Sequence, residues 1–254
     1  MASPEYAEFE RKGYVVLPEV LTAREVETWS GAIDEHRQRF SRLWMERGEG
    51  GRTQSVHVLL SRRELDDSIL HARVLPLVIE LVGEDIVCEE HSVMIREPID
   101  EDPPQPKWHR DTRHEPSHAL GIHSLSVVYY LTDVDETTHC FSVVPEAAMT
   151  KRGAGSPECD GADGRDLLGP AGTAILLDAG SCHAGRLRKT TQPRRTVHIY
   201  YRSRNTTATE RTHDLPATPD RACGSARQTI VPTTESDHSC RPWSGSGLTT
   251  GRPA

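Results

Sequence analysis

The sequence has few aromatic residues and no long apolar run, and both shortages limit what the chain can be. Phe, Trp and Tyr together make up 5% of its 254 residues, so a buried core must rely on Val, Leu and Ile. No stretch approaches the ~20 consecutive apolar residues that a membrane-spanning helix needs. The first residues, MASPE, lack the basic segment followed by an apolar one that marks a signal peptide. We therefore expect a cytoplasmic protein without membrane partners.

The sequence also lacks an excess of basic residues. Lys and Arg number 30 against 38 Asp and Glu, which gives a formal net charge of −8. Basic residues are scattered apart from a cluster at 186–195, so a nucleic-acid partner is not expected. The 6 cysteines form no CxxC pair and no dense framework, which favours free thiols in a reducing compartment. Nothing in the composition predicts the oligomeric state.

Helices are predicted in the first third of the chain. Thr22 and Glu25 have the spacing of a capping box, in which a hydroxyl and a carboxylate satisfy free N–H groups of the first helical turn. The helix that begins there is predicted to end near the Gly-rich segment 48–51. Apolar residues predict a second helix over 63–82, which Pro76 kinks or divides.

Short apolar runs separated by Pro, Gly and Asp follow, and they predict a β-sandwich or barrel rather than alternating β-α-β units. The predicted strands are 85–88, 92–96, 125–131, 140–144, 172–177 and 196–201. We expect one domain over 1–204, with a helical part at 1–84 and a β core at 85–204. Residues 205–254 are rich in Thr, Ser, Pro, Arg and Gly, which predicts a poorly ordered tail.

One short motif, Trp108-His109-Arg110-Asp111, suggests a metal site. Alternate side chains of a strand point to the same face, so His109 and Asp111 can both reach one ion. Two His and one carboxylate on one face of an octahedron are typical of non-haem Fe(II) oxygenases, whose open positions take co-substrate and O₂. The motif alone is weak, because 13 His in the chain produce on the order of one such match by chance. A third ligand must come from elsewhere.

Two residues further along the chain support the metal interpretation. His183 follows a turn after the strand predicted at 172–177, and Arg194 opens another predicted strand. A buried arginine can hold a carboxylate through two parallel N–H···O bonds, which a lysine cannot reproduce. A dicarboxylate co-substrate needs such an anchor at the end distant from the metal.

These elements, in this order, resemble the phytanoyl-CoA dioxygenase-like family of 2-oxoglutarate oxygenases over about residues 9–201. The resemblance is carried by FERKGYVVL at 9–17, LVG at 81–83, REP at 96–98, WHRD at 108–111, YLTDVD at 130–135, SVVP at 142–145, His183 and Arg194. It implies a mainly β fold with flanking helices, the double-stranded β-helix or cupin-like jelly roll. The chain departs from the family at Glu146-Ala147-Ala148, where Gly-Ser-His is common, and lacks the Asn often found after the distal His.

The resemblance also implies roles for individual residues. His109, Asp111 and His183 match the Fe(II) ligands, and Arg194 matches the residue that binds the distal carboxylate of 2-oxoglutarate. The implied reaction oxidises a small-molecule substrate with O₂ while 2-oxoglutarate becomes succinate and CO₂. Related halogenases have Gly or Ala in place of Asp111, so hydroxylation, desaturation or cyclisation is favoured here.

Five more residues are weaker candidates. Tyr130 and Arg96 are candidates for binding 2-oxoglutarate, and Arg113, His114 and Met94 for contacting the substrate; each is otherwise a loop charge or a core residue. Two other functions stay open. One is a metal-dependent jelly-roll enzyme without 2-oxoglutarate, such as an isomerase or a cupin-type dioxygenase, and the other is a non-catalytic binding module of the same fold.

Overall fold

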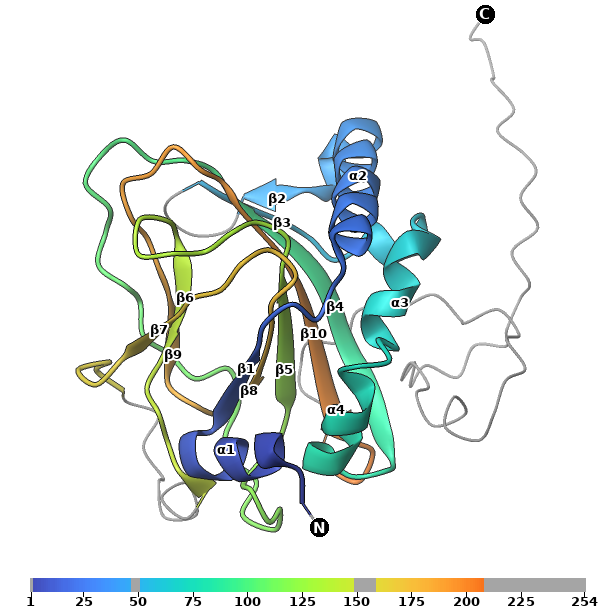
Figure 1. Cartoon of the computed structure of the whole chain (residues 1–254), viewed down its shortest axis with the longest axis vertical. Helices are drawn as coiled ribbons and strands as arrows, with labels where there is room; N and C mark the ends of the chain where they lie inside the picture. The colour runs from blue at the N-terminus through green and yellow to red at the C-terminus, as the bar shows by residue number, and fades with distance from the viewer. Residues whose placement is uncertain (1, 47–50, 149–158, 208–254) are drawn as a thin grey trace, which may run out of the picture.

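The structure is a computed structural model that describes residues 2–46, 51–148 and 159–207, and in it two antiparallel sheets face each other (Figure 1). The larger sheet has strand order β1-β8-β5-β10-β4-β3-β2 and the smaller one has the order β7-β6-β9. Helices α2, α3 and α4 lie on the outer side of the larger sheet, beside β4 and β10 (Figure 1). The predicted fold, a mainly β jelly roll with flanking helices, is confirmed.

The bounds of the elements are as follows. The larger sheet contains β1 (Tyr14–Leu17), β2 (Met45–Glu46), β3 (Arg52–Ser55), β4 (Ile86–Arg96), β5 (Leu125–Tyr130), β8 (Ala174–Asp178) and β10 (Arg194–Ser203). The smaller sheet contains β6 (Cys140–Val143), β7 (Arg165–Leu167) and β9 (His183–Arg186). The helices are α1 (Pro4–Lys12), α2 (Ala23–Arg39), α3 (Asp66–Ile69) and α4 (Leu75–Val82), with 3₁₀ turns η1 (Ser41–Leu43), η2 (Val58–Leu60) and η3 (Arg63–Leu65). Within the described ranges, none of these helices has the length and apolar character to cross a membrane.

Local sequence decides where the first helices begin and end. α1 stops at Gly13, whose φ of 77° lies in the left-handed region that glycine adopts without strain. α2 begins with the predicted capping box: the Glu25 N–H donates to the Thr22 hydroxyl, and the Thr22 N–H donates to the Glu25 carboxylate. However, α2 ends at Arg39, well before residues 48–51, because the chain turns there into η1 and then pairs as β2 with β3.

Several predicted boundaries change through strand pairing and packing. The helix predicted over 63–82 is divided into η3, α3 and α4. Pro76 lies in the first turn of α4, where a backbone N–H has no partner within the helix, so proline costs no hydrogen bond there. The strands predicted at 85–88 and 92–96 are one strand, β4, held by a ladder with β10 that a bulge interrupts. β7 and β9 were not predicted, because RDL and HAGR are polar or small and become strands only through pairing with β6.

The two faces of the larger sheet meet different surroundings, and this difference positions the site. Val93 and Val197, opposite each other on β4 and β10, belong to the core shared with the helices, which also contains Trp29. Successive strand residues point to opposite faces, so every second residue from Arg194 to Tyr200 points between the two sheets. The interior between the sheets is therefore lined with polar side chains along β10.

A disulfide joins Cys159 to Cys182. The prediction of free thiols is wrong for this pair, whereas Cys88 and Cys140 are free and buried. No CxxC spacing marks the pair in the sequence, because the two cysteines meet only through the fold. The tail predicted over 205–254 lies outside the described residues except for its first three positions.

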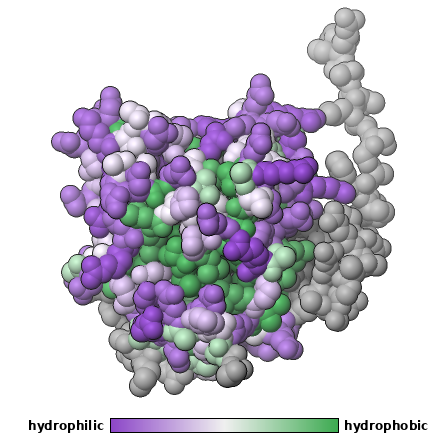
Figure 2. Space-filling view, viewed as in Figure 1, coloured by the Kyte–Doolittle hydropathy of each residue, from purple (hydrophilic) through white to green (hydrophobic). Residues whose placement is uncertain are grey.

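A hollow on the surface lies apart from the interior between the sheets. Figure 2 shows apolar side chains gathered at the centre of one face, with hydrophilic side chains around them. The hollow has a volume of about 580 Å³, and its apolar walls are Leu17, Pro18, Val20, Pro76 and Leu77. None of the candidate site residues lines this hollow.

Candidate metal centre

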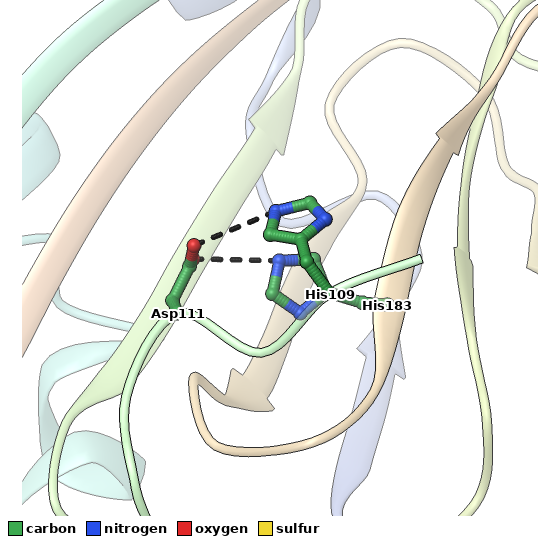
Figure 3. Close-up of side chains that lie close together, drawn as sticks. All are labelled: His109, Asp111 and His183. Carbon is green, nitrogen blue, oxygen red and sulfur yellow. Dashed lines mark ion pairs between the residues drawn. The ribbon is translucent and has the colours of Figure 1, made fainter. Parts of the chain in front are cut away.

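Three side chains meet between the two sheets, two from one short motif and the third from more than 70 residues further along the chain. His109 and His183 lie opposite each other in an isolated antiparallel bridge, and each backbone N–H donates to the other's carbonyl, at 3.0 and 2.9 Å. The carboxylate oxygens of Asp111 lie 3.5 Å from Nε2 of His109 and 3.4 Å from Nε2 of His183 (Figure 3). One ligand atom from each residue lies within 4.8 Å of the others. This spacing allows all three to bind one ion.

The local backbone at Asp111 differs from the prediction. His109 belongs to the bridge, but Asp111 lies in a bend rather than on a continuing strand. The N–H of Asp111 donates to the carbonyl of Ala179 at 2.9 Å, which joins the bend to the turn before β9. The bend directs the carboxylate at the two rings, so the side chains converge without strand alternation.

Backbone carbonyls determine which ring nitrogens face the carboxylate. Nδ1 of His109 lies 2.9 Å from the carbonyl of Lys107, and Nδ1 of His183 lies 2.9 Å from the carbonyl of Ser181. A carbonyl only accepts, so each Nδ1 carries a proton, and in the neutral ring Nε2 then presents a lone pair. Metal-binding histidines are oriented in this way, with the second ring nitrogen donating to an oxygen. The two rings are therefore prepared to bind a cation through Nε2.

Tyr200 supports the carboxylate and was not predicted. Its hydroxyl donates to Oδ2 of Asp111 at 2.7 Å from the inner face of β10. The sequence did contain one indication of this role: Tyr200 lies an even number of residues from Arg194 on the same predicted strand, so both side chains point to the same face. A hydrogen bond of this kind orients a metal-binding carboxylate.

The centre is open on one side. The side chain of His109 is 52% exposed, whereas those of Asp111 and His183 are 9% and 4% exposed. The Phe141 ring stacks on His183, with ring centroids 5.5 Å apart and planes 15° apart. Access to the centre is therefore on the His109 side, and the His183 side is packed.

Arg194 is a buried cation in the same interior. Its exposed fraction is 3%, and its guanidinium carbon lies 5.9 Å from the centroid of the Phe141 ring, which stacks on His183. Among the described residues, its Nε and Nη1 have no hydrogen-bond partner. Burial lowers the pKa of Arg194. A buried guanidinium with open donors is costly unless an anion binds it, so this position fits a carboxylate ligand.

The weaker candidates lie in different surroundings. Arg96 is next to Arg194 in register and Met94 is opposite Thr196, so both point into the interior between the sheets. The Tyr130 hydroxyl donates to the Leu167 carbonyl at 2.8 Å and accepts the Phe141 N–H at 3.2 Å, which fixes it against the smaller sheet.

The two remaining candidates follow the metal motif. Arg113 is exposed. Nδ1 of His114 lies 3.1 Å from Oδ2 of the fully buried Asp178, so this ring belongs to a network of ion pairs.

That network begins at Arg110, between the two motif residues. Its guanidinium binds both oxygens of Glu146, at 2.7 and 2.6 Å, and also donates to the Gly180 carbonyl at 2.7 Å. Nε2 of His114 lies 3.7 Å from Glu146. Burial by itself raises the pKa of Glu146, but hydrogen bonds and charges from His114 and Arg110 outweigh it and lower this pKa to about 2. The network joins the three segments that carry or flank His109, Asp111 and His183.

We expect the Arg110–Glu146 pair to hold these segments together. Arg110→Met and Glu146→Met should each destabilise the protein, because each leaves a partly buried charge alone, and the double variant should recover part of the loss. The two changes should be non-additive by about 1–3 kcal/mol in the free energy of unfolding, measured by urea unfolding of the unaltered protein, the two single variants and the double variant. The exposed Lys12–Glu8 pair, with side chains 37% and 36% exposed, is the control and should couple far more weakly. Equal coupling in both pairs would contradict the prediction.

Solved structures of several enzymes share this fold. They include the non-heme α-ketoglutarate-dependent carbocyclase SnoK from nogalamycin biosynthesis, at 20% identity and TM-score 0.65, covering 80% of this chain and 84% of SnoK. The epimerase SnoN from the same biosynthesis matches at 20% identity and TM-score 0.64, covering 91% and 94%. HygX from Streptomyces hygroscopicus, solved with nickel, 2-oxoglutarate and hygromycin B, matches at 17% identity and TM-score 0.64, covering 85% and 94%. Among curated proteins there is no significant match.

The family model of phytanoyl-CoA dioxygenase matches residues 9–196, which is most of the chain. The match begins at the first helix and extends into β10, so it contains His109, Asp111, His183 and Arg194. The predicted resemblance is confirmed, and with it the prediction of an enzyme. The chain belongs to the phytanoyl-CoA dioxygenase family.

Proposed function

We propose that this chain is an Fe(II)- and 2-oxoglutarate-dependent dioxygenase that oxidises a small organic molecule and releases succinate and CO₂. The observation that carries the proposal is the joint presence, in one interior, of two lone-pair nitrogens facing a carboxylate and a buried arginine with open donors. Neither feature alone selects this chemistry. Together they match a metal ion and a dicarboxylate that binds it.

In this proposal His109, Asp111 and His183 bind the iron. Two imidazoles and one carboxylate suit Fe(II) and leave positions open for other ligands. Iron at this centre would supply the redox chemistry that couples decarboxylation of 2-oxoglutarate to oxidation of the substrate. The protein itself orients the rings through the carbonyls of Lys107 and Ser181.

Arg194 is the proposed anchor for the distal carboxylate of 2-oxoglutarate. A guanidinium offers two parallel donors to one carboxylate, and its burial strengthens that interaction. Arg96 beside it and Tyr130 on the adjacent strand stay candidates for the same ligand, and Met94 stays a candidate for substrate contact.

The reaction type is proposed from Asp111. A carboxylate at this position occupies the place that halogenases of the family leave to chloride, which favours hydroxylation, desaturation or cyclisation. SnoK is a carbocyclase and SnoN an epimerase, so the fold itself does not select one outcome. HygX is solved with the small molecule hygromycin B bound, which supports a metabolite as the substrate class here.

Anaerobic addition of Fe(II) and then 2-oxoglutarate should produce a weak visible charge-transfer band, saturating near one equivalent of each ligand per chain. Succinate in place of 2-oxoglutarate is the control, because it lacks the 2-oxo group needed to chelate the metal and should give no band. A folded protein that takes up Fe(II) and shows no band with 2-oxoglutarate would contradict the proposal. A succinate-release screen across metabolites would then identify the substrate.

A further inference from the structure

A disulfide lies directly beside one of the proposed metal ligands. Cys182, which immediately precedes His183, is joined to Cys159. Cys182 is 1% exposed, and its carbonyl accepts the Val144 N–H at 2.8 Å, so a backbone contact holds it independently of the disulfide. Cys159 is half-buried and begins a short segment, residues 159–164, that leads into β7. The disulfide therefore attaches this segment to the region of the metal centre.

Residues 159–164, here called the clasp turn, lie against the side chain of Trp108. A Cβ added at Gly161 or at Gly164 would overlap the indole ring, so the glycine backbone packs directly on that ring. The Gly164 N–H donates to the Gly161 carbonyl at 2.9 Å, which fixes the shape of the turn but not its place against Trp108. The disulfide at one end and β7 at the other hold the turn in that place.

Trp108 immediately precedes the other proposed histidine ligand, His109. Residues 102–108 have no regular secondary structure before the bridge at His109. The His109 ring is 52% exposed, whereas His183 is almost fully buried, so the His109 ring depends more on the Lys107 carbonyl that lies 2.9 Å from its Nδ1. That carbonyl belongs to the planar peptide group between Lys107 and Trp108. An anchored indole ring therefore helps to keep the acceptor of His109 in place.

We propose that the clasp turn is a redox-sensitive device that positions His109 through Trp108. With the disulfide formed, the turn stays on the indole ring and the Lys107 carbonyl orients His109. Reduction releases the Cys159 end, the turn leaves the ring, and the centre binds its metal more weakly. Trp108 is thus a positioning residue. The inference rests on the proposed function, since it concerns metal binding at the same centre.

The reductant in this proposal is a dithiol, and access decides which sulfur reacts first. One thiolate of the dithiol attacks Sγ of Cys159, the more exposed of the two cysteines, and Cys182 leaves as a thiolate. The second thiol of the reductant then attacks the mixed disulfide, which releases Cys159 and closes the disulfide of the reductant. Two electrons and two protons pass to the protein, and both cysteines become thiols. Exchange with an oxidised dithiol reverses the reaction.

Calorimetric titration of the full chain with Ni(II), in its oxidised and reduced forms, tests the proposal. The protein is reduced with dithiothreitol, which is then removed under argon so that it cannot bind the metal. Reduction should weaken Ni(II) binding by roughly 10–100-fold, the loss typical when a group that orients a metal ligand is removed. Reoxidation should restore the affinity. Cys159→Ala/Cys182→Ala should bind as weakly as the reduced protein and should not respond to the dithiol, which excludes effects of new thiol ligands and of the other cysteines.

Variants of the contact itself keep the disulfide and should have the same effect. Oxidised Trp108→Ala should bind Ni(II) as weakly as the reduced unaltered protein, and reduction should weaken it no further. Gly164→Ala should behave likewise, because its Cβ would displace the ring or the turn. Trp108→Phe should recover part of the affinity, because a smaller ring still packs on the glycines. Gly31→Ala is the matched control: a Cβ there meets nothing within 4 Å, so affinity and redox response should not change.

Two results would overturn the proposal while leaving the metal centre intact. One is equal Ni(II) affinity of the oxidised and reduced unaltered protein. The other is that reduction weakens binding by Trp108→Ala as much as by the unaltered protein, which would mean that the disulfide acts without Trp108. Failure of the proposed function is distinct, because the redox response of Ni(II) binding would then persist without a charge-transfer band for Fe(II) and 2-oxoglutarate. Absence of Ni(II) uptake by the oxidised protein would overturn both proposals.

Discussion

Asp111→Ala should abolish oxidation while leaving the protein folded. The change removes the only anionic member of the triad and leaves two neutral imidazoles, whose Nε2 atoms lie 3.5 and 3.4 Å from its carboxylate. Loss of activity should exceed the roughly 10–100-fold loss of affinity or activity typical of an altered partner of a metal ligand. The structural cost should be about 1 kcal/mol, because the Tyr200 hydroxyl loses one acceptor. Succinate release, Ni(II) titration and urea unfolding measure these effects.

Tyr200→Phe provides a graded control for this experiment. It keeps the carboxylate and removes only the hydrogen bond that orients it. We expect metal affinity to fall by roughly 10–100-fold, with oxidation reduced but present. Oxidation retained by Asp111→Ala, with the protein folded, would show that this carboxylate is not a ligand.

Arg194→Gln should raise the concentration of 2-oxoglutarate needed for half-maximal binding by on the order of 10²–10³-fold. The distal carboxylate would then be buried without its cation, and a missing partner in a buried pair costs roughly 3–5 kcal/mol. The stability of the metal-free protein should not fall with this loss of binding. The metal-free variant should unfold at the same or a higher urea concentration, because a buried charge with two unpartnered atoms has been removed.

Arg195→Gln is the matched control, one residue along the same strand. Its guanidinium lies on the outer face and pairs with Asp34, so 2-oxoglutarate binding should be unchanged. If Arg194→Gln also left that binding unchanged, a metal-dependent enzyme without 2-oxoglutarate would become the better hypothesis. If neither Arg194→Gln nor Arg195→Gln took up metal, a non-catalytic binding module would become the better hypothesis.

Together the two variants separate the functions of two parts of the interior. Asp111 acts at the metal and Arg194 at the far end of the co-substrate, so the first change should remove metal binding and the second should not. Asp111→Ala should also bind 2-oxoglutarate more weakly, because the co-substrate chelates the metal, whereas loss of metal binding in Arg194→Gln would indicate a damaged fold. Urea unfolding of each protein makes this distinction.

Short-range rules made much of this protein predictable from its sequence. The capping box at Thr22 and Glu25 starts α2 as predicted, because the bonds involved span only a few residues. Pro76 marks the start of α4 for a similarly local reason. The order of motifs, from the first helix to the opening of β10, predicted the family and therefore the jelly roll.

The site residues illustrate how far such rules reach. His109, Asp111, His183 and Arg194 were selected by motif and spacing, and the structure brings the first three within reach of one ion. Their roles in binding metal and co-substrate stay predictions until the experiments above are done. The strand assumed for Asp111 was wrong, because a hydrogen bond to Ala179 bends the chain there.

Tertiary structure alone decided the remaining features. The sequence determined which residues can bind a metal or a carboxylate, but the support of Asp111 by Tyr200 and the position of Arg96 beside Arg194 depend on contacts between segments that are distant in sequence. The disulfide of Cys159 depends on the same long-range placement. Register is set by which faces of many strands are buried together, and no local pattern of residues specifies that.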